Sequence, residues 1–397
     1  MDRPDEIKAL SDLAGDALEE TVRVVEDVHT AVADRVDAHL PPAAKPVSAI
    51  VRAQTALTYQ TVRAAHKWIP RGLGRVAAAR TDPDGPSLLA SPGRSRTAAA
   101  LHGIWGASAS DRLGATPQLT LFHHGDPVDP SLLTALVADA PPNLVLLLHG
   151  LSETEADWER QPRDLPEPRT PYAPRLEAEE PVTVLAVRYP TGLAIGENGQ
   201  ALAAMLDEID ARWPDLATIT LVGHSMGGLV ARSAAHHADA DGRDWVTRLK
   251  LIVTLGSPHL GAPLAQAVDL AEKALGAFPE SAPIGRVLGT RSPGVRDLSA
   301  GRILVGDTEE LDPPVVPGVT YCTVASTLTE NPGHPVAQLL GDGMVLVPSA
   351  RGRNRTRHLD FHADRHIGGL NHIAMLNDPQ VYELIRGWID EFTLTGG

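Results

Sequence analysis

The serine at position 225 lies in a pattern that suits a catalytic nucleophile. The segment GHSMG at residues 223–227 has the form G-x-S-x-G, and it follows the apolar run Thr218–Val222, which is typical of a strand. The residues from Leu229 onward are typical of a helix. A sharp turn between a strand and a helix exposes a serine oxygen, and glycines on either side keep the chain from colliding with itself. We therefore predict that Ser225 attacks a carbonyl carbon.

Four segments together resemble the α/β-hydrolase superfamily. They are LLHG at residues 147–150, GHSMGG at 223–228, TLGSPHLGAPLA at 254–265 and GDGMV at 341–345. Within the superfamily, the chain is similar to bacterial triacylglycerol lipases and to GPI inositol-deacylase-like esterases over about residues 96–392. The resemblance implies an ester-cleaving serine and no cofactor, neither a metal nor an organic group. Residues 1–95 resemble no family.

An oxyanion hole would hold the negative oxygen of the tetrahedral intermediate. The backbone N–H of Met226, directly after the nucleophile, is the expected first donor. By resemblance, the second is the N–H of Leu151, the residue after His149-Gly150. The side chain of Leu151 would also place apolar surface beside the reacting carbonyl.

The resemblance places the catalytic acid after the nucleophile and the histidine last in the chain. The candidate acids are Asp297, Asp307, Asp312, Asp342 and Asp360. Asp342 is favoured because it lies between two glycines, follows the apolar run Val319–Ala325 and precedes the apolar MVLV at residues 344–347. A carboxylate would orient the histidine and stabilise its charged form.

Four histidines near the end of the chain could act as the base, namely His358, His362, His366 and His372. The resemblance favours His372, which lies in the loop segment GGLNHIA before the last helix, with His366 as the second choice. His259 and Leu260 follow another strand and are expected to border the substrate. His259 precedes Asp342, so the order along the chain argues against a catalytic role for it.

The elements that position these residues alternate between strands and helices. This alternation predicts an α/β fold with a mostly parallel sheet and helices on both faces. The expected strands are Arg96–Ala107, Gln118–His123, Asn143–Leu148, Val182–Tyr189, Thr218–Val222, Lys250–Leu255, Val319–Ala325 and Thr356–Phe361. The expected helices of this part lie at Gly199–Arg212, after Ser225, and at Val381–Phe392.

The N-terminal part has a different pattern. Apolar residues at helical spacing predict helices over residues 5–40 and 47–69, and Pro70 is expected to end the second. We predict a helical segment at 1–80, a linker at 81–95, and a hydrolase domain at 96–397 with a lid-like insertion at about 263–317. The apolar faces of the helices must cover something, and a homodimer is one option.

Composition and charge limit the classes of molecule that the protein is expected to bind. The 397 residues carry a formal charge of −15, which disfavours nucleic acids and anionic membranes. The single cysteine, Cys322, excludes an intrachain disulfide and lies in an apolar run typical of a buried strand. No metal cluster of Cys and His is visible. The acidic N-terminus leads into no apolar leader, and no run is long enough to cross a membrane, so we expect a cytoplasmic protein.

These patterns predict a serine esterase or lipase that cleaves carboxylic esters through an acyl-enzyme. The substrate is a small-molecule or lipid ester, and the apolar residues Leu151, Leu260 and Leu264–Leu275 favour medium to long acyl chains, as in lipid metabolism. The same catalytic residues could serve an acyltransferase or a thioesterase. A binding protein that kept the fold without turnover is the alternative from another class.

Overall fold

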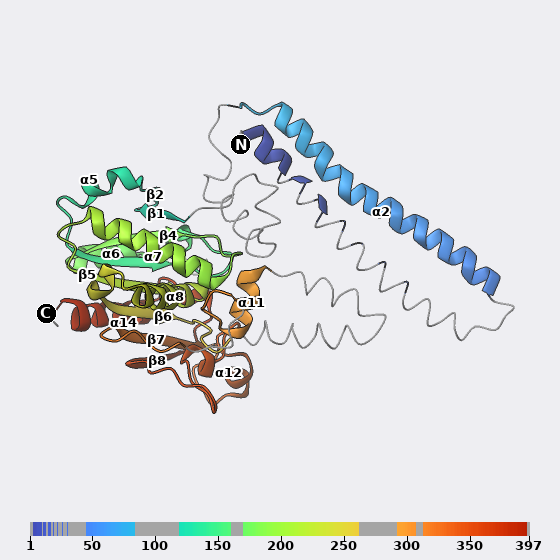
Figure 1. Cartoon of the computed structure of the whole chain (residues 1–397). Coiled ribbons are helices and arrows are strands. Elements are labelled where there is room, and N and C mark those ends of the chain that lie inside the picture. Colours follow the sequence, from blue (N-terminus) through green and yellow to red (C-terminus); the bar gives the residue numbers. More distant parts are fainter. Residues whose placement is uncertain are drawn as a thin grey trace. The chain divides into compact units, whose positions relative to one another are not determined.

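The computed structural model describes residues 3–9, scattered positions between 11 and 30, and residues 45–83, 119–159, 170–261, 292–306 and 313–394. Contacts divide the chain into two compact units, of which the first carries the N-terminal helices and the second the β-sheet (Figure 1). The strand expected at Arg96–Ala107 lies outside the described residues. So do most of the linker and the larger part of the lid-like insertion.

One eight-stranded sheet in the order β2-β1-β4-β3-β5-β6-β7-β8 forms the centre of the second unit. The strands from β4 across to β8 run parallel to one another, whereas β1 is antiparallel to both of its neighbours, β2 and β4. The strands are β1 Thr120–His123, β2 Asp126–Pro127, β3 Asn143–Leu148, β4 Val182–Arg188, β5 Thr218–His224, β6 Leu249–Leu255, β7 Thr320–Thr327 and β8 Ala363–Gly368. The predicted fold class, an α/β sheet that is mostly parallel, is confirmed.

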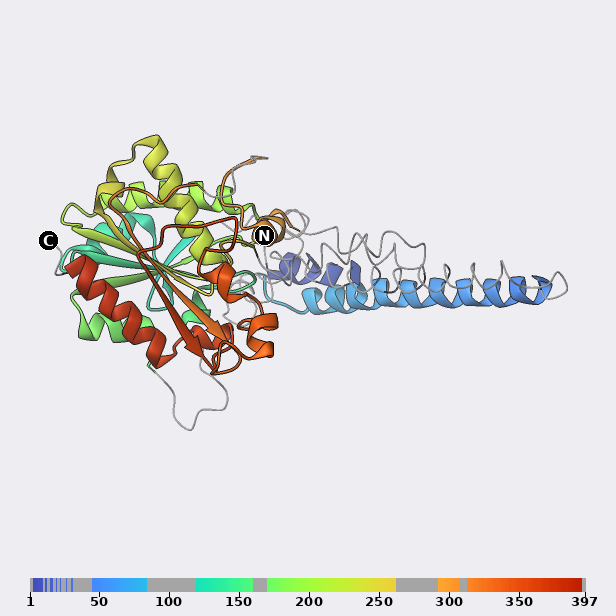
Figure 2. The ribbon, with the colours of Figure 1, turned by 90° about the horizontal axis from the view of Figure 1, so that it is seen from below.

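Helices cover both faces of this sheet (Figure 2). The α-helices are α5 Leu133–Val137, α6 Tyr172–Glu179, α7 Ile195–Arg212, α8 Met226–Asp241, α11 Pro293–Ala300, α12 Pro335–Leu340, α13 Val347–Ala350 and α14 Pro379–Ile389. Short turns of 3₁₀ helix are η3 Pro130–Leu132, η4 Glu155–Glu159, η5 Asp244–Arg248 and η6 Ile373–Met375. A π-helical turn, η7 Asp390–Leu394, follows α14.

The core lies in two layers because successive side chains of a strand point to opposite faces. Leu144, Leu146 and Leu148 of β3 pack with α7 and α8, whereas Val145 and Leu147 pack with α6 and α14. All five are buried. A strand covered on both faces needs a continuous apolar run, which is why β3 could be predicted at its observed bounds.

One strand prediction is wrong. Residues 356–361 form no strand, and His358 makes only an isolated bridge to Arg353. The last strand, β8, begins at Ala363 instead. It lies at the edge of the sheet, where partly exposed polar residues are tolerated, so it lacks the apolar run that marks the inner strands.

The first unit contains α2, a helix that spans Lys45–Ala79. Its basic residues pair with acidic residues of the N-terminal segment in reverse chain order, so the two segments run antiparallel. The pairs are Arg63–Glu26, Lys67–Glu19 and Arg71 with both Asp16 and Asp12.

The prediction that Pro70 ends this helix is wrong, because α2 continues for nine more residues. Proline removes one helical hydrogen bond, but contacts on both sides of it hold the helix, and Lys67 before it pairs with Glu19. Arg71 pairs with Asp16, and Gly74 lies so close to Ser11 that an added Cβ would be 2.1 Å from its Oγ. Among the helices of the described residues, none combines the length and the hydropathy that a membrane crossing requires.

Candidate active site

The nucleophile candidate occupies the turn between β5 and α8. Ser225 has φ 52° and ψ −119°, a backbone conformation that residues with a Cβ rarely adopt. The turn is tight enough to require its glycines. A Cβ on Gly223 would lie 2.3 Å from the nitrogen of Gly228, and a Cβ on Gly227 would lie 2.3 Å from the carbonyl oxygen of Leu148. The sequence therefore holds a serine in a strained turn at the end of a central strand.

A buried carboxylate, Asp342, follows β7 in the chain, and a buried histidine, His372, follows β8. His372 Nδ1 is 2.8 Å from Asp342 Oδ2, and both side chains are almost fully buried. The other carboxylate oxygen accepts hydrogen bonds from the backbone N–H groups of Met344 and Val345. These bonds fix the carboxylate, which in turn keeps the proton on Nδ1 and leaves Nε2 of His372 available as a base.

Short links through the backbone bring His372 next to Ser225. The N–H of Ser225 donates to the carbonyl of Leu255, and Nε2 of the preceding residue, His224, lies 3.1 Å from the carbonyl oxygen of His372. A Cβ on Gly256 would lie 3.1 Å from Cε1 and Nδ1 of the His372 ring. The structure thus brings together Ser225, Asp342 and His372, the three residues predicted for catalysis.

The oxyanion candidates lie beside the serine. Met226 is the first residue of α8, where helix geometry leaves the backbone N–H without an acceptor in the helix. Gly150 lies close to the serine, because an added Cβ would be 3.0 Å from Cβ of Ser225. Leu151 follows it directly, so both predicted donors, Leu151 and Met226, belong to segments that border the nucleophile.

The sheet is parallel with an antiparallel edge. A serine follows β5, and a hydrogen-bonded Asp–His pair follows β7 and β8. This is an α/β-hydrolase fold.

The chain is similar to one family model and to several solved structures. Residues 199–279 match the family model described as a PGAP1-like alpha/beta domain. The mature lipase BlEst2 of Bacillus licheniformis is 20% identical, with a TM-score of 0.44, covering 63% of this chain and 92% of that one. RedJ, a thioesterase of prodiginine biosynthesis in Streptomyces coelicolor, is 19% identical, with a TM-score of 0.35 and coverage of 66% and 92%. A thermophilic esterase of Thermogutta terrifontis is 17% identical, with a TM-score of 0.36 and coverage of 64% and 91%. No curated protein sequence matches the chain.

A second buried pair of charged side chains lies in the second unit and was not predicted from the sequence. His224 Nδ1 lies 2.9 Å from Glu153 Oε2, and His224 Nε2 lies 3.1 Å from the carbonyl oxygen of His372. Both partners are acceptors, so both ring nitrogens donate and the ring is an imidazolium. The same oxygen of Glu153 accepts the N–H of Gly150 at 2.6 Å. The pair therefore connects Gly150 to the backbone of His372.

The pKa values of the pair agree with this assignment. Burial opposes ionisation of Glu153, but the charge of His224 and its hydrogen bond outweigh burial and lower the Glu153 pKa to about 2. Burial also opposes protonation of His224, and the Glu153 carboxylate outweighs it and raises the His224 pKa. No local pattern could have revealed the pair, because its two residues are 71 positions apart.

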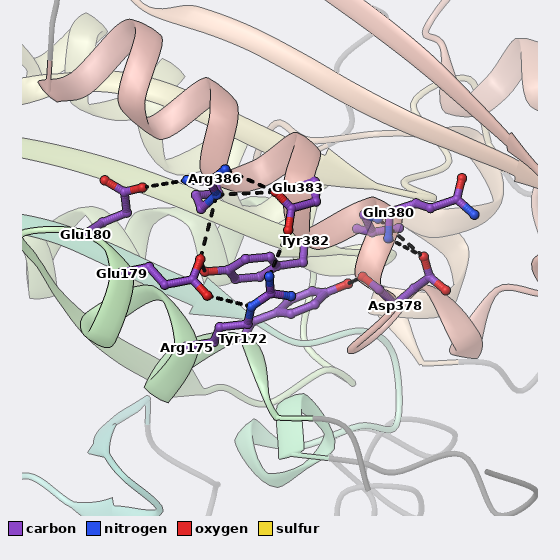
Figure 3. Close-up of polar contacts among 10 residues, drawn as sticks. Tyr172, Arg175, Glu179, Glu180, Asp378, Gln380, Tyr382, Glu383 and Arg386 are labelled. Carbon is purple, nitrogen blue, oxygen red and sulfur yellow. Dashed lines mark hydrogen bonds and ion pairs between the residues drawn. The ribbon is translucent and has the colours of Figure 1, made fainter. Parts of the chain in front are cut away.

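The loop that carries His372 is anchored to α6 and to the segment before it. Asn377, which has φ 62°, donates to the carbonyl of Trp158 and accepts from the backbone N–H of Tyr172. The hydroxyl of Tyr172 lies 2.7 Å from the carbonyl oxygen of Met375 and 2.9 Å from that of Asp378, so its single proton is shared between the two acceptors. Figure 3 shows how ion pairs between α6 and α14 continue this contact, with Arg175 bound to Glu383. These contacts hold η6 and the residues after it, directly following His372 in the chain.

Other predicted residues have different surroundings. His259 is fully buried, with Nδ1 accepting from Arg232 and Nε2 next to Thr254 Oγ1, and burial, together with the Arg232 charge, lowers its pKa well below the usual value. Both ring nitrogens of His259 are engaged by protein groups, and its expected contact with the substrate stays a prediction. Leu260 is buried and donates its N–H to Ser349.

The alternative acids and bases are engaged elsewhere or exposed. Asp297 accepts the N–H of Ile195, and Asp360 pairs with His358 in a largely exposed position. His366 Nε2 lies 3.0 Å from Thr327 Oγ1, and the His362 ring packs edge-on against Phe392. Asp307 and Asp312 lie outside the described residues.

A cavity of about 450 Å³ lies between β1, α5 and α7, lined in part by Leu121, Leu133 and Met205. None of its lining residues belongs to the triad or to the oxyanion segments, so we do not assign it to the substrate.

Proposed function

We propose that the protein is a serine esterase that hydrolyses carboxylic esters through an acyl-enzyme. The observation that carries this proposal is the strained serine at the start of α8 beside a buried histidine–aspartate pair. In this mechanism Ser225 Oγ attacks the carbonyl carbon while His372 Nε2 takes its proton. Asp342 holds Nδ1–H and stabilises the imidazolium that forms.

The negative oxygen of the intermediate would be held by the N–H groups of Met226 and Leu151. One such donor is typically worth about 3–4 kcal/mol of barrier. His372 then donates its proton to the departing alcohol. A water molecule, deprotonated by His372 in turn, attacks the acyl-enzyme and releases the acid, which restores the serine. Every step uses groups of the chain and water.

Medium to long acyl chains are the proposed substrates. The partly buried side chain of Leu151 packs against the core cluster beside the oxyanion segment, which supplies an apolar surface near the carbonyl. The stretch Leu264–Leu275, which was also expected to line the acyl site, lies outside the described residues. Each methylene buried on binding contributes at most about 0.8 kcal/mol, or roughly a factor of four in kcat/KM.

A panel of p-nitrophenyl esters from acetate to palmitate tests the proposal. We expect hydrolysis that rises from acetate towards longer chains, and we expect Ser225→Ala to lose both hydrolysis and labelling by a fluorophosphonate. Ser257→Ala is the matched control, because its Oγ is buried without a hydrogen-bond partner among the described residues. Labelling that persists in Ser225→Ala contradicts the assignment of the nucleophile, and a steady fall from acetate upwards contradicts the chain-length preference.

The alternatives differ in the acceptor or in the leaving group. If an added alcohol becomes esterified instead of the acid accumulating, the protein is an acyltransferase. If a thioester is cleaved much faster than the matched ester, it is a thioesterase. If Ser225 reacts with no fluorophosphonate and no ester is cleaved, the fold serves binding.

A further inference from the structure

The turn between β1 and β2 places two adjacent histidines on the same side of the chain. His124 has φ 51° and Gly125 has φ 83°, which is the geometry of a two-residue hairpin turn. Neighbouring residues of a strand normally point to opposite faces. Here the turn redirects His124, so that its ring stacks on that of His123 with centroids 3.8 Å apart.

A carboxylate faces both rings. Glu177 of α6 has Oε2 2.6 Å from His124 Nε2 and Oε1 3.6 Å from His123 Nε2. Oε1 also accepts the backbone N–H of Val184, so β4 fixes the carboxylate. One ligand atom from each of the three side chains lies within 4.8 Å of the other two. Such a set can converge on one ion through small rotations of the side chains.

We propose that His123, His124 and Glu177 bind a divalent transition-metal ion of the zinc class. Two imidazoles and one carboxylate are ligands that zinc takes in proteins, with bonds of about 2.0–2.2 Å in a tetrahedron. The fourth position would be taken by water, because the His124 side chain is 56% exposed. Calcium and magnesium prefer six or more oxygens, and this set offers a single carboxylate.

The ion would have a structural role. β1 runs antiparallel to β4, and Phe122 pairs with Ala186, so the same register places His123 opposite Leu185, in the middle of β4. Ser225, in contrast, follows the end of β5, which runs in the direction of β4. The metal ligands therefore lie back from the strand ends that Ser225 follows, and β4 and β3 separate β1 from β5 in the sheet. Bound metal would link the β1–β2 hairpin to α6 and raise stability without taking part in hydrolysis.

Calorimetric titration of the tag-free, chelator-treated full chain with ZnCl₂ tests the proposal, with thermal melting as a second readout. We expect one zinc ion per chain and a higher melting temperature with zinc than without it. His123→Ala and His124→Asn are expected to weaken zinc binding by at least about tenfold, since even indirect ligand partners are worth 10–100-fold. Asparagine suits the positive φ of the turn, so His124→Asn tests the ligand without breaking the hairpin.

The matched control is the double variant His236→Ala/His237→Ala in α8. These histidines are also adjacent, but their rings meet edge to face at 5.7 Å. We expect the control to bind zinc as the unaltered chain does. Equal binding by His124→Asn, no binding by the unaltered chain, or a preference for CaCl₂ over ZnCl₂ would each overturn the proposal. Ester hydrolysis is measured in parallel and should not change on zinc removal, so the result is independent of the proposed function.

Discussion

Ser225 combines a reactive position with a backbone conformation that favours glycine. Its φ of 52° and ψ of −119° are held by the surrounding structure, including the bond from its N–H to Leu255. Conformations of this kind typically cost about 1–3 kcal/mol in a residue with a Cβ. The turn therefore stores strain that lowers the stability of the fold, as expected where a serine acts as the proposed nucleophile.

Two inactive variants separate strain from chemistry. Ser225→Ala and Ser225→Gly should both lose ester hydrolysis, but Ser225→Gly should be more stable than Ser225→Ala by about 1 kcal/mol, because glycine adopts this conformation freely. Urea unfolding of the two variants measures the difference. Equal midpoints would mean that the turn is not strained in solution.

Asp342 should affect turnover more than binding. Asp342→Asn is expected to lower kcat by roughly four orders of magnitude with little change in KM, because it favours the wrong tautomer of His372 and leaves substrate contacts intact. Steady-state kinetics on one ester measures both constants. Asp360→Asn is the control, since its side chain is 87% exposed and should be neutral. A large loss of kcat in Asp360→Asn and none in Asp342→Asn would contradict the assignment of Asp342 as the acid.

The buried pair Glu153–His224 predicts a dependence of stability on pH. The Glu153 pKa is lowered from 4.5 to about 2, so its contribution is present above about pH 4.5 and lost as the pH falls towards 2. The His224 pKa is raised from 6.5, so its contribution is present below pH 6.5 and lost as the pH rises through the raised value. The pair thus stabilises the fold most between about pH 4.5 and 6.5.

Glu153→Gln should remove this stabilisation. Breaking a buried pair typically costs about 3–5 kcal/mol, and the loss of unfolding free energy should be largest in that pH range. Urea unfolding from pH 4 to pH 9 measures it. Glu208→Gln, at an exposed pair with Arg212, should change stability by less than about 0.5 kcal/mol at every pH. A loss that does not vary with pH would mean that the pair is uncharged.

The sequence could predict the residues of the site that lie within a local pattern. Ser225 is marked by its glycines and Asp342 by the turn around it, and both lie where the pattern places them. Glu153 could not be predicted, because its role depends on a histidine far away in the chain. The same holds for Glu177, which only the fold brings to His123 and His124.

The contact between α6 and the turn before α14 holds the loop that carries His372. Tyr172→Phe removes the hydroxyl whose proton the carbonyls of Met375 and Asp378 share, and we expect a loss of about 1 kcal/mol in unfolding free energy because these carbonyls lose that donor. Tyr382→Phe is the same substitution at a hydroxyl bound to Glu179, which is partly exposed and can bind water instead. Thermal or urea unfolding compares the two, and a larger loss in Tyr382→Phe would contradict the anchoring role.

The accuracy of the predicted elements follows from where they lie in the sheet. Inner strands such as β3 and β6 carry apolar runs because both faces are covered, and their bounds agree within one residue. Residues 358–361, HLDF, alternate between polar and apolar types and resemble a strand, but they lie in a loop before β8. In the same way, Pro70 marks a helix end locally, whereas the ion pairs of α2 with a distant segment decide otherwise.

The first unit carries exposed apolar side chains, from which a partner surface was predicted. Large apolar side chains of α2, including Trp68, Ile69 and Leu73, are exposed among the described residues. The expected homodimer finds no support in the structure or in the comparisons. The prediction that these faces cover another surface stays a prediction, and light scattering of the full chain measures its mass directly.

The single cysteine gives the molecule a built-in reporter of its own opening. Cys322 is buried in β7, and burial raises the pKa of its thiol to about 12. Only the thiolate reacts with alkylating reagents, so the folded chain should resist them, and each labelling event should record a moment when the sheet has come apart. The rate of iodoacetamide incorporation should therefore rise with urea in step with unfolding. Rapid labelling without urea would show that β7 opens locally, at a far smaller free energy than the rest of the sheet.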